Sequence, residues 1–170
     1  MLKLVLPTPE YKEQILSYKE EFLANGDSMD GCAGLDRAES FEAWYEKWKM
    51  TLSSETVPNG WVDSTTYLAV EENDVLVGMI DVRHRLNDFL LKHGGHIGYS
   101  IRKSQRRKGY ATEMLGLALK ECPKFGIERA LVTCSKANIG SAKTIQKNGG
   151  VLENEIQDGD RITQRYWIEV

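Results

Sequence analysis

The architecture of this chain follows from the segment Ile97-Gly98-Tyr99-Ser100-Ile101-Arg102-Lys103-Ser104-Gln105-Arg106-Arg107-Lys108-Gly109-Tyr110-Ala111-Thr112-Glu113-Met114-Leu115. The pattern predicts a strand over 96–101, a basic loop, and an amphipathic helix that ends near Pro123. The start of a helix carries unpaired backbone N–H groups and the positive end of the helix dipole, so this loop favours an anion. Gly109 lets the backbone approach a phosphate closely, because it has no Cβ. Together with the small Ala111 on the next turn, this geometry indicates a pyrophosphate site.

A cluster of basic residues like the one in this loop also occurs in other kinds of site. Five of the seven residues over 102–108 are Lys or Arg, which is typical as well of a localisation signal, a nucleic-acid patch or a solvated surface. Their position between a strand and a helix favours the pyrophosphate site. ATP and NAD are not predicted, because the chain has neither G-x-x-x-x-G-K-S/T nor G-x-G-x-x-G.

Apolar spacing predicts the remaining elements of the chain. Helices are expected over 10–24, with Thr8 as a cap, and from Ser40 onward. The other expected elements are a strand over 3–6, a hairpin over 65–83, a helical excursion over 87–92, a helix over 138–147, and strands over 127–133, 151–156 and 162–170. The order β-α-α-β-β-β-α-β-α-β-β predicts an α/β (α+β) fold. We expect a single domain over 1–170, with a mixed, mostly antiparallel sheet of six to seven strands flanked by about four helices.

Composition narrows the class of protein. The 170 residues carry a formal charge of −3, and 41% are hydrophobic, which is not the composition of a disordered chain. The first 101 residues sum to −8 and the rest to +5, so the chain is acidic in front and basic behind. Three cysteines without C-x-x-C spacing predict free, buried thiols. With no signal peptide and no membrane-length apolar run, we expect a cytoplasmic protein without membrane or nucleic-acid partners.

A family resemblance rests on these same residues. The segment 106–111 matches the R/Q-x-x-G-x-G/A acyl-CoA loop, the preceding strand reads Ile-Gly-Tyr-Ser-Ile-Arg, and Asn138-x-x-Ser141 lies downstream. In these features and in its element order the chain resembles the GNAT-type N-acetyltransferases. The resemblance implies an acyl-CoA-dependent N-acyltransferase that moves acetyl from acetyl-CoA to a primary amine by direct attack in a ternary complex. Acetyl-CoA is then the co-substrate, and no metal is implied.

The resemblance also implies which residues hold the coenzyme. Its pyrophosphate would contact the loop and the helix start, namely Arg106, Arg107, Lys108, Gly109, Tyr110, Ala111 and Thr112. Its pantetheine arm would pair like an added strand with Tyr99, Ser100 and Ile101. On the other side of the arm the implied residues are Asn138, Ser141 and Lys143.

The usual catalytic positions depart from the family pattern. Ile145 stands where many relatives have a tyrosine acid, and Thr133 stands where some have a glutamate. An amine with a pKa near ~10 must lose a proton before it attacks a thioester, and a base poised near neutral pH serves best. His96 is the candidate base, with a structural histidine as the alternative. Tyr99 is a second candidate, if its hydroxyl points into the site rather than packing in the sheet.

Other groups carry less specific signals. His93-x-x-His96 has no third ligand at supporting spacing, so no metal site is predicted. Cys134 has no histidine spaced to activate it as a nucleophile. An amine-binding acidic cleft is suggested by Asp27, Asp30, Asp36, Glu39 and Glu42, against the alternative of a solvated face. Aromatic walls of this cleft could come from Trp44, Trp48 and Trp61, against the alternative of core packing.

Two further functions stay open. The missing tyrosine and glutamate would suit a non-catalytic module that senses acyl-CoA, and the loop over 102–108 would suit a nucleic-acid binder. The sequence does not distinguish among an antibiotic, a polyamine, an amino acid and a protein terminus as acceptor. It also leaves open the acyl-chain preference and whether the chain is a monomer or a homodimer.

Overall fold

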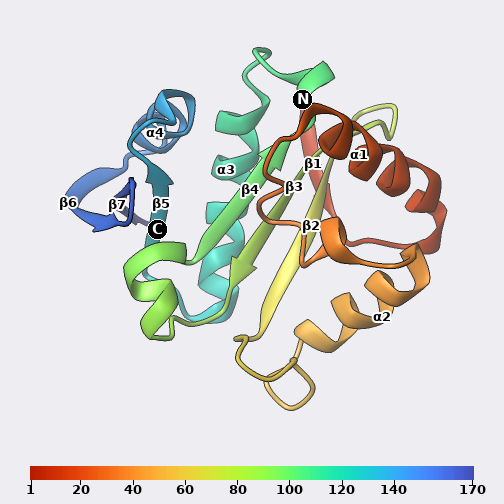
Figure 1. The fold of residues 1–170 in the computed structure, drawn as a ribbon, viewed down its shortest axis with the longest axis horizontal. Coiled ribbons are helices and arrows are strands. Elements are labelled where there is room, and N and C mark those ends of the chain that lie inside the picture. Colours follow the sequence, from red (N-terminus) through yellow and green to blue (C-terminus); the bar gives the residue numbers. More distant parts are fainter.

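A seven-stranded sheet runs through the protein in the order β1-β2-β3-β4-β5-β7-β6 (Figure 1). The structure is a computed structural model that describes residues 1–170. Its strands are β1 (Leu2–Val5), β2 (Ser64–Glu71), β3 (Leu76–Arg83), β4 (Ile97–Ile101), β5 (Arg129–Ser135), β6 (Val151–Asp158) and β7 (Arg161–Glu169). Only β4 and β5 are parallel, and every other neighbouring pair is antiparallel. The mixed, mostly antiparallel sheet confirms the predicted fold class.

Helices cover both faces of this sheet (Figure 1). They are α1 (Lys12–Asn25), α2 (Phe41–Thr51), α3 (Tyr110–Glu121) and α4 (Ile139–Lys147). The pair α1 and α2 packs on one face, and α3 with α4 packs on the other. A π-helical turn over Leu90–Gly94 takes the place of the predicted helical excursion. None of the helices combines the length and apolar composition needed to cross a bilayer.

Two hydrophobic cores lie on opposite faces of the sheet. Alternation along β3 sends Met79 to the core under α1 and α2, and Ile80 to the core under α3. Trp44 and Trp48 are buried in the first core, where their indole N–H groups donate to backbone carbonyls of Cys32 and Thr66. These two tryptophans are therefore core residues and do not line a cleft. The three cysteines are buried free thiols, as predicted.

The two predicted helix caps have different outcomes. Ser40 Oγ accepts a hydrogen bond from the Ala43 N–H at 3.0 Å, which confirms the start of α2. The prediction for Thr8 is wrong, because its side chain makes no capping bond. A 3-10 turn over Pro9–Tyr11 separates Thr8 from α1, so the free N–H groups of α1 lie beyond its reach.

The parallel strands β4 and β5 diverge almost as soon as they meet. Their backbones pair at one position, Ile97 with Val132. Next to this pair, the His96 N–H donates to the Leu131 carbonyl at 2.7 Å. Beyond it the strands separate toward the ends that lead into α3 and α4. The sheet is therefore closed at one end of this pair and open at the other.

The loop between α1 and α2 rests directly on β4. Gly31 has a φ of +71°, and a Cβ added to it would lie 2.3 Å from the carbonyl oxygen of Gly98 and 2.8 Å from Tyr99 Cα. Any other residue here would have to push backbone away from backbone. Gly31 therefore sets how closely this loop approaches the open part of the β4–β5 pair.

Replacing Gly31 tests this contact. Gly31→Ala should lower the free energy of unfolding by about 3 kcal/mol, combining left-handed strain with overpacking against β4. Gly26→Ala is the matched control, because Gly26 also has a positive φ (+65°) but has open space around it. The control should cost only about 1 kcal/mol. Urea denaturation of both variants measures the difference, and equal losses would contradict the close contact.

Candidate active site

One edge of β4 has no strand partner over most of its length. At the two ends of β4, His96 accepts a backbone bond from β3 and Arg102 donates one to it. Because backbone groups alternate in direction along a strand, the intervening Tyr99 and Ile101 turn their N–H and C=O groups toward β5. The β4–β5 pairing has already ended at Ile97, so this edge faces a gap. An extended ligand can hydrogen bond there as an added strand would.

The loop after β4 forms a concave array of N–H donors. Gly109 is the N-cap of α3 with a φ of 81°, and Arg107 has a φ of 63°. No backbone N–H over 107–112 has an acceptor within the protein. Successive N–H groups in left-handed turns make anion-binding concavities, and the dipole of α3 adds positive potential. This geometry fits the predicted pyrophosphate site.

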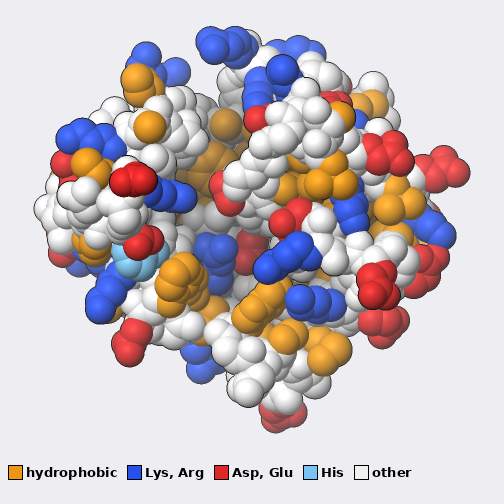
Figure 2. All heavy atoms as spheres, in the orientation of Figure 1, with side chains coloured by type: hydrophobic (Ala, Val, Ile, Leu, Met, Phe, Trp, Pro, Cys, Tyr) orange, Lys and Arg blue, Asp and Glu red, His pale blue; other side chains and the backbone are white.

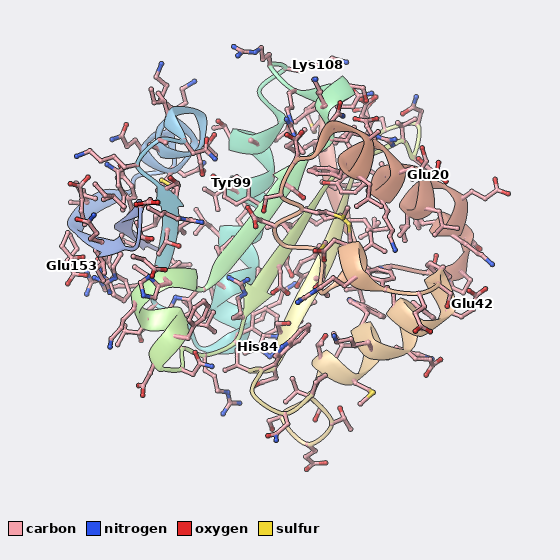
Figure 3. All side chains as sticks on the ribbon, in the orientation of Figure 1. Glu20, Glu42, His84, Tyr99, Lys108 and Glu153 are labelled. Atoms are coloured by element: carbon pink, nitrogen blue, oxygen red, sulfur yellow. The ribbon has the colours of Figure 1, made fainter.

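The basic side chains of the loop differ in how they are held. Arg106 donates from Nε to the Ile101 carbonyl at 2.8 Å and pairs with Asp27 at 3.1 Å, so it is tied to the body of the protein. Arg107 and Lys108 are exposed at the rim, and Lys108 stands at the upper end of the molecule in Figure 3.

Two other side chains, on either side of this loop, point away from the array of N–H donors. Arg102 pairs with Glu21 and donates to Ser17, which fastens the end of β4 to α1. The Tyr110 hydroxyl donates to Glu71 at 2.8 Å, so only its backbone belongs to the donor array. The run of five basic residues is thus partly structural and does not form one free cationic patch.

Tyr99 reaches from β4 to the start of α4. Its hydroxyl lies 2.8 Å from Ser141 Oγ, and Asn138 caps the same helix by accepting the Ser141 N–H at 3.1 Å. Burial raises the pKa of Tyr99 to about 12, against the opposing effect of the Ser141 hydrogen bond. Tyr99 therefore keeps its proton at neutral pH. Lys143 is exposed on α4, and Ile145 is fully buried in the core.

A similar hydroxyl pair lies on the opposite face of β4. Tyr18 of α1 places its hydroxyl 2.8 Å from Ser100 Oγ, and both residues are buried. The side chain of Ser100 thus turns away from Tyr99, toward the core under α1 and α2. By the same alternation the N–H and C=O of Ser100 point toward β3, and its carbonyl also accepts from the Tyr18 hydroxyl at 2.9 Å, so Ser100 offers no free group to the gap.

His96 sits at the closed end of the β4–β5 pair. Its Nδ1 accepts the Leu131 N–H at 2.9 Å, and its ring borders a shallow 410 Å³ hollow together with His84. Burial and then the charge of Arg83 lower the pKa of His96 to about 4. The neutral ring already uses its lone pair on Leu131, so accepting a proton would break that bond. This geometry favours the structural alternative for His96.

A larger cleft of 610 Å³ opens on the face covered by α1 and α2. Figure 2 shows it as a central hollow with basic and acidic side chains on its floor. Its charged lining comes from Asp27, Asp30, Asp36, Arg37, Asp81 and Arg83. Of the expected aromatic residues, Trp61 lines it. Glu39 and Glu42 do not line it, and Glu42 pairs with Lys12 on the surface at 2.6 Å.

Asp81 and Arg83 were not among the residues predicted for the site. They lie at alternate positions of β3, where Arg83 Nε contacts Asp81 Oδ2 at 3.0 Å. Charged residues on the inner face of an otherwise apolar strand were the available signal in the sequence. The register of β3 against β4 places Asp81 opposite Gly98, the residue before Tyr99.

Comparison with known proteins agrees with this geometry. A family model described as "Acetyltransferase (GNAT) domain" matches residues 3–151. The chain is 32% identical over 78 residues to the "Uncharacterized N-acetyltransferase YjdG" of Bacillus subtilis (strain 168), which spans 44% of this chain and 42% of that protein. The aligned part therefore covers less than half of this curated relative.

Solved structures share the fold from end to end. The microcin C7 self-immunity acetyltransferase MccE, solved with acetyl-CoA and AMP, matches with a TM-score of 0.73 at 15% identity, over 99% of this chain and 92% of that one. RimL, a ribosomal L7/L12 alpha-N-protein acetyltransferase solved with coenzyme A, matches with a TM-score of 0.72 at 15% identity, over 99% and 94%. At such low identity these likenesses concern the fold. With the family model covering most of the sequence as well, the chain belongs to the GNAT acetyltransferase family.

Proposed function

We propose that this protein transfers the acetyl group of acetyl-CoA to a primary amine by direct attack in a ternary complex. The observation that carries the proposal is the unpaired edge of β4 next to the array of free N–H donors before α3. The amine nitrogen attacks the thioester carbonyl carbon, and the carbon–sulfur bond breaks. The nitrogen gives up one proton, and the departing thiolate takes one.

The coenzyme site follows from its chemistry. The pyrophosphate would accept hydrogen bonds from the backbone N–H groups over 107–112, with Arg107 and Lys108 adding charge at the rim. The amide-bearing pantetheine arm would pair with the Tyr99 and Ile101 edge. Ser141 and the free amide nitrogen of Asn138 would face the arm from α4, and Lys143 would add charge at the mouth.

Tyr99 is our candidate for the group that protonates the leaving thiolate. Its hydroxyl stands on the α4 side of the gap, beside Ser141, and it keeps its proton at neutral pH because burial raises its pKa. The family position for a tyrosine acid is Ile145, which is buried and apolar. A phenol that enters from β4 would supply the same chemistry from the facing element.

The proton of the amine needs a separate route. His96 was the predicted base, but its lone pair is engaged by the Leu131 N–H at the closed end of the strand pair. We therefore assign this proton to water in the open 610 Å³ cleft, with the acidic loop of Asp30 and Asp36 beside it. The backbone N–H of Tyr99 faces the gap and would polarise the thioester carbonyl.

Coenzyme binding gives the first test. Acetyl-CoA should raise the melting temperature of the wild-type protein, because a ligand that binds only the folded state stabilises it. Gly109→Glu should remove this shift, because it puts a side chain and a negative charge into the donor array. Differential scanning fluorimetry with increasing acetyl-CoA measures both effects.

Gly126→Glu is the matched control for this experiment. Gly126 also has a positive φ (+75°) with open space around it, but it lies before β5 at the far end of the sheet. The control should lose stability by backbone strain and keep the acetyl-CoA shift. If millimolar acetyl-CoA does not raise the melting temperature of the wild-type protein, the proposed acetyl transfer is wrong.

The role of Tyr99 gives the second test. Tyr99→Phe should lower kcat by about 100-fold or more, the usual size of a lost general acid, and leave the KM for acetyl-CoA nearly unchanged. The assay follows release of the coenzyme thiol with a panel of primary amines.

Tyr18→Phe is the control for loss of a buried hydroxyl pair. It removes an equivalent Tyr–Ser contact on the other face of β4, and it should reduce stability without a specific loss of kcat. Similar kcat values for the two variants would contradict the assignment of Tyr99. Coenzyme binding without thiol release on any amine would instead indicate the acyl-CoA sensor.

A further inference from the structure

The 610 Å³ cleft is lined by an arginine, Arg83, whose side chain is held by the protein on one side and has free N–H groups on the other. Arg83 Nε contacts Asp81, and its Nη1 donates to the carbonyl oxygens of Gly94 and Gly95 at 3.1 and 3.3 Å. Asp81 is itself held by the Thr66 hydroxyl at 2.9 Å. These bonds hold the guanidinium in one orientation. Its Nη2 has no partner within the protein and is not sealed from solvent.

The guanidinium lies flat on β4 because of a glycine. A Cβ added to Gly98 would lie 3.0 Å from Arg83 Nη2, so a larger residue would push the arginine away. Gly98 directly precedes Tyr99, the first residue of the unpaired β4 edge. The free N–H groups of Arg83 are thus presented next to the place where we expect the thioester. A bound anion there would lie close to the attacking amine.

Carboxylates occupy the facing wall of the cleft. Asp27 is paired with Arg106, and both carboxylate oxygens of Asp81 are engaged, Oδ1 by the Thr66 hydroxyl and Oδ2 by Arg83. Asp30 and Asp36 have no cationic partner. The Gly31 contact with β4 brings the neighbouring Asp30 beside Tyr99. A cationic amine would be attracted to this wall while an anion is held at Arg83.

The rest of the lining is largely apolar. Trp61, Phe89, Leu90 and Met29 border the same cleft, and Trp61 and Phe89 are exposed to it. Figure 2 shows hydrophobic side chains around the central hollow. An extended polyamine would leave both this surface and the free Nη2 of Arg83 unused.

We propose that the acceptor is a free α-amino acid with an apolar side chain, whose carboxylate is bound by Arg83. This inference rests on the proposed acetyl transfer and names the substrate class for it. An α-amino acid carries its amine and carboxylate on one carbon, which matches an anion site beside the reaction centre. A protein terminus has an amide in place of that carboxylate, and spermidine has no anion. Attack by the amine nitrogen on the thioester carbonyl then yields the N-acetyl amino acid and free coenzyme A.

The test compares amino acids with their own amides. Thiol release from acetyl-CoA is measured with each common L-amino acid, with its α-amide, and with spermidine. We expect leucine, methionine or phenylalanine to be acetylated with a kcat/KM at least ~10-fold above that of the matching amide. Arg83→Gln should lower kcat/KM for the amino acid by about 10- to 100-fold and abolish the preference over the amide.

Arg85→Gln is the matched control. Arg85 also pairs with an aspartate, Asp63 at 2.8 Å, but it lines neither hollow. It should keep the preference for the acid over the amide. Retention of the acetyl-CoA melting shift by Arg83→Gln will show that this variant is folded and binds the coenzyme.

Different results contradict the amino-acid acceptor and the proposed acetyl transfer. The inference is overturned if amides or spermidine react as well as amino acids, if Arg83→Gln keeps the preference, or if no amino acid reacts although acetyl-CoA binds. Absence of any acetyl-CoA melting shift in the wild-type protein overturns the proposed function itself.

Discussion

The organisation of the site depends on one constraint, that β4 and β5 are parallel neighbours joined at a single backbone pair. The pair Ile97–Val132 and the adjacent His96–Leu131 bonds close one end of the strands and let the other end open. Apart from the Ile101 carbonyl, which accepts from Arg106 Nε, the edge that is left over has no partner within the protein. Because β4 leads directly into α3, the free strand edge and the free N–H groups of the helix start lie at the same opening. A ligand with an extended arm and a phosphate end can satisfy both.

The other elements keep this opening in shape. On one face, Arg102 and Tyr18 tie β4 to α1, while on the other the Tyr99 hydroxyl meets Ser141 of α4. The loop at Gly31 rests on β4 from the α1 side and forms one wall of the cleft. The gap therefore runs between two separately packed cores, each anchored to one face of the sheet. The two faces of β4 therefore carry different contacts: Tyr99 meets Ser141 of α4 on one face, and Ser100 meets Tyr18 of α1 on the other.

The sequence predicted the parts of the site that depend on neighbours along the chain. The strand, basic loop and helix over 97–115 followed from apolar spacing and Gly109, and Ser40 was a correct cap because capping is local. The side chain of Arg106 could not be placed, since its partner Asp27 lies just beyond the distant end of α1. Asp81 and Arg83 were missed for a similar reason. Their role depends on the register of β3 against β4 and on the space above Gly98, and both are tertiary features.

The unpaired edge of β4 has a consequence for the protein before any ligand arrives. An open strand edge is a template for strands of other chains, and proteins usually cover or charge such edges to avoid aggregation. Here the closed end at Ile97 and the adjacent β5 leave a slot rather than an exposed sheet border. In our proposal the coenzyme arm fills this slot, so that it covers the β4 edge as well as delivering the acetyl group.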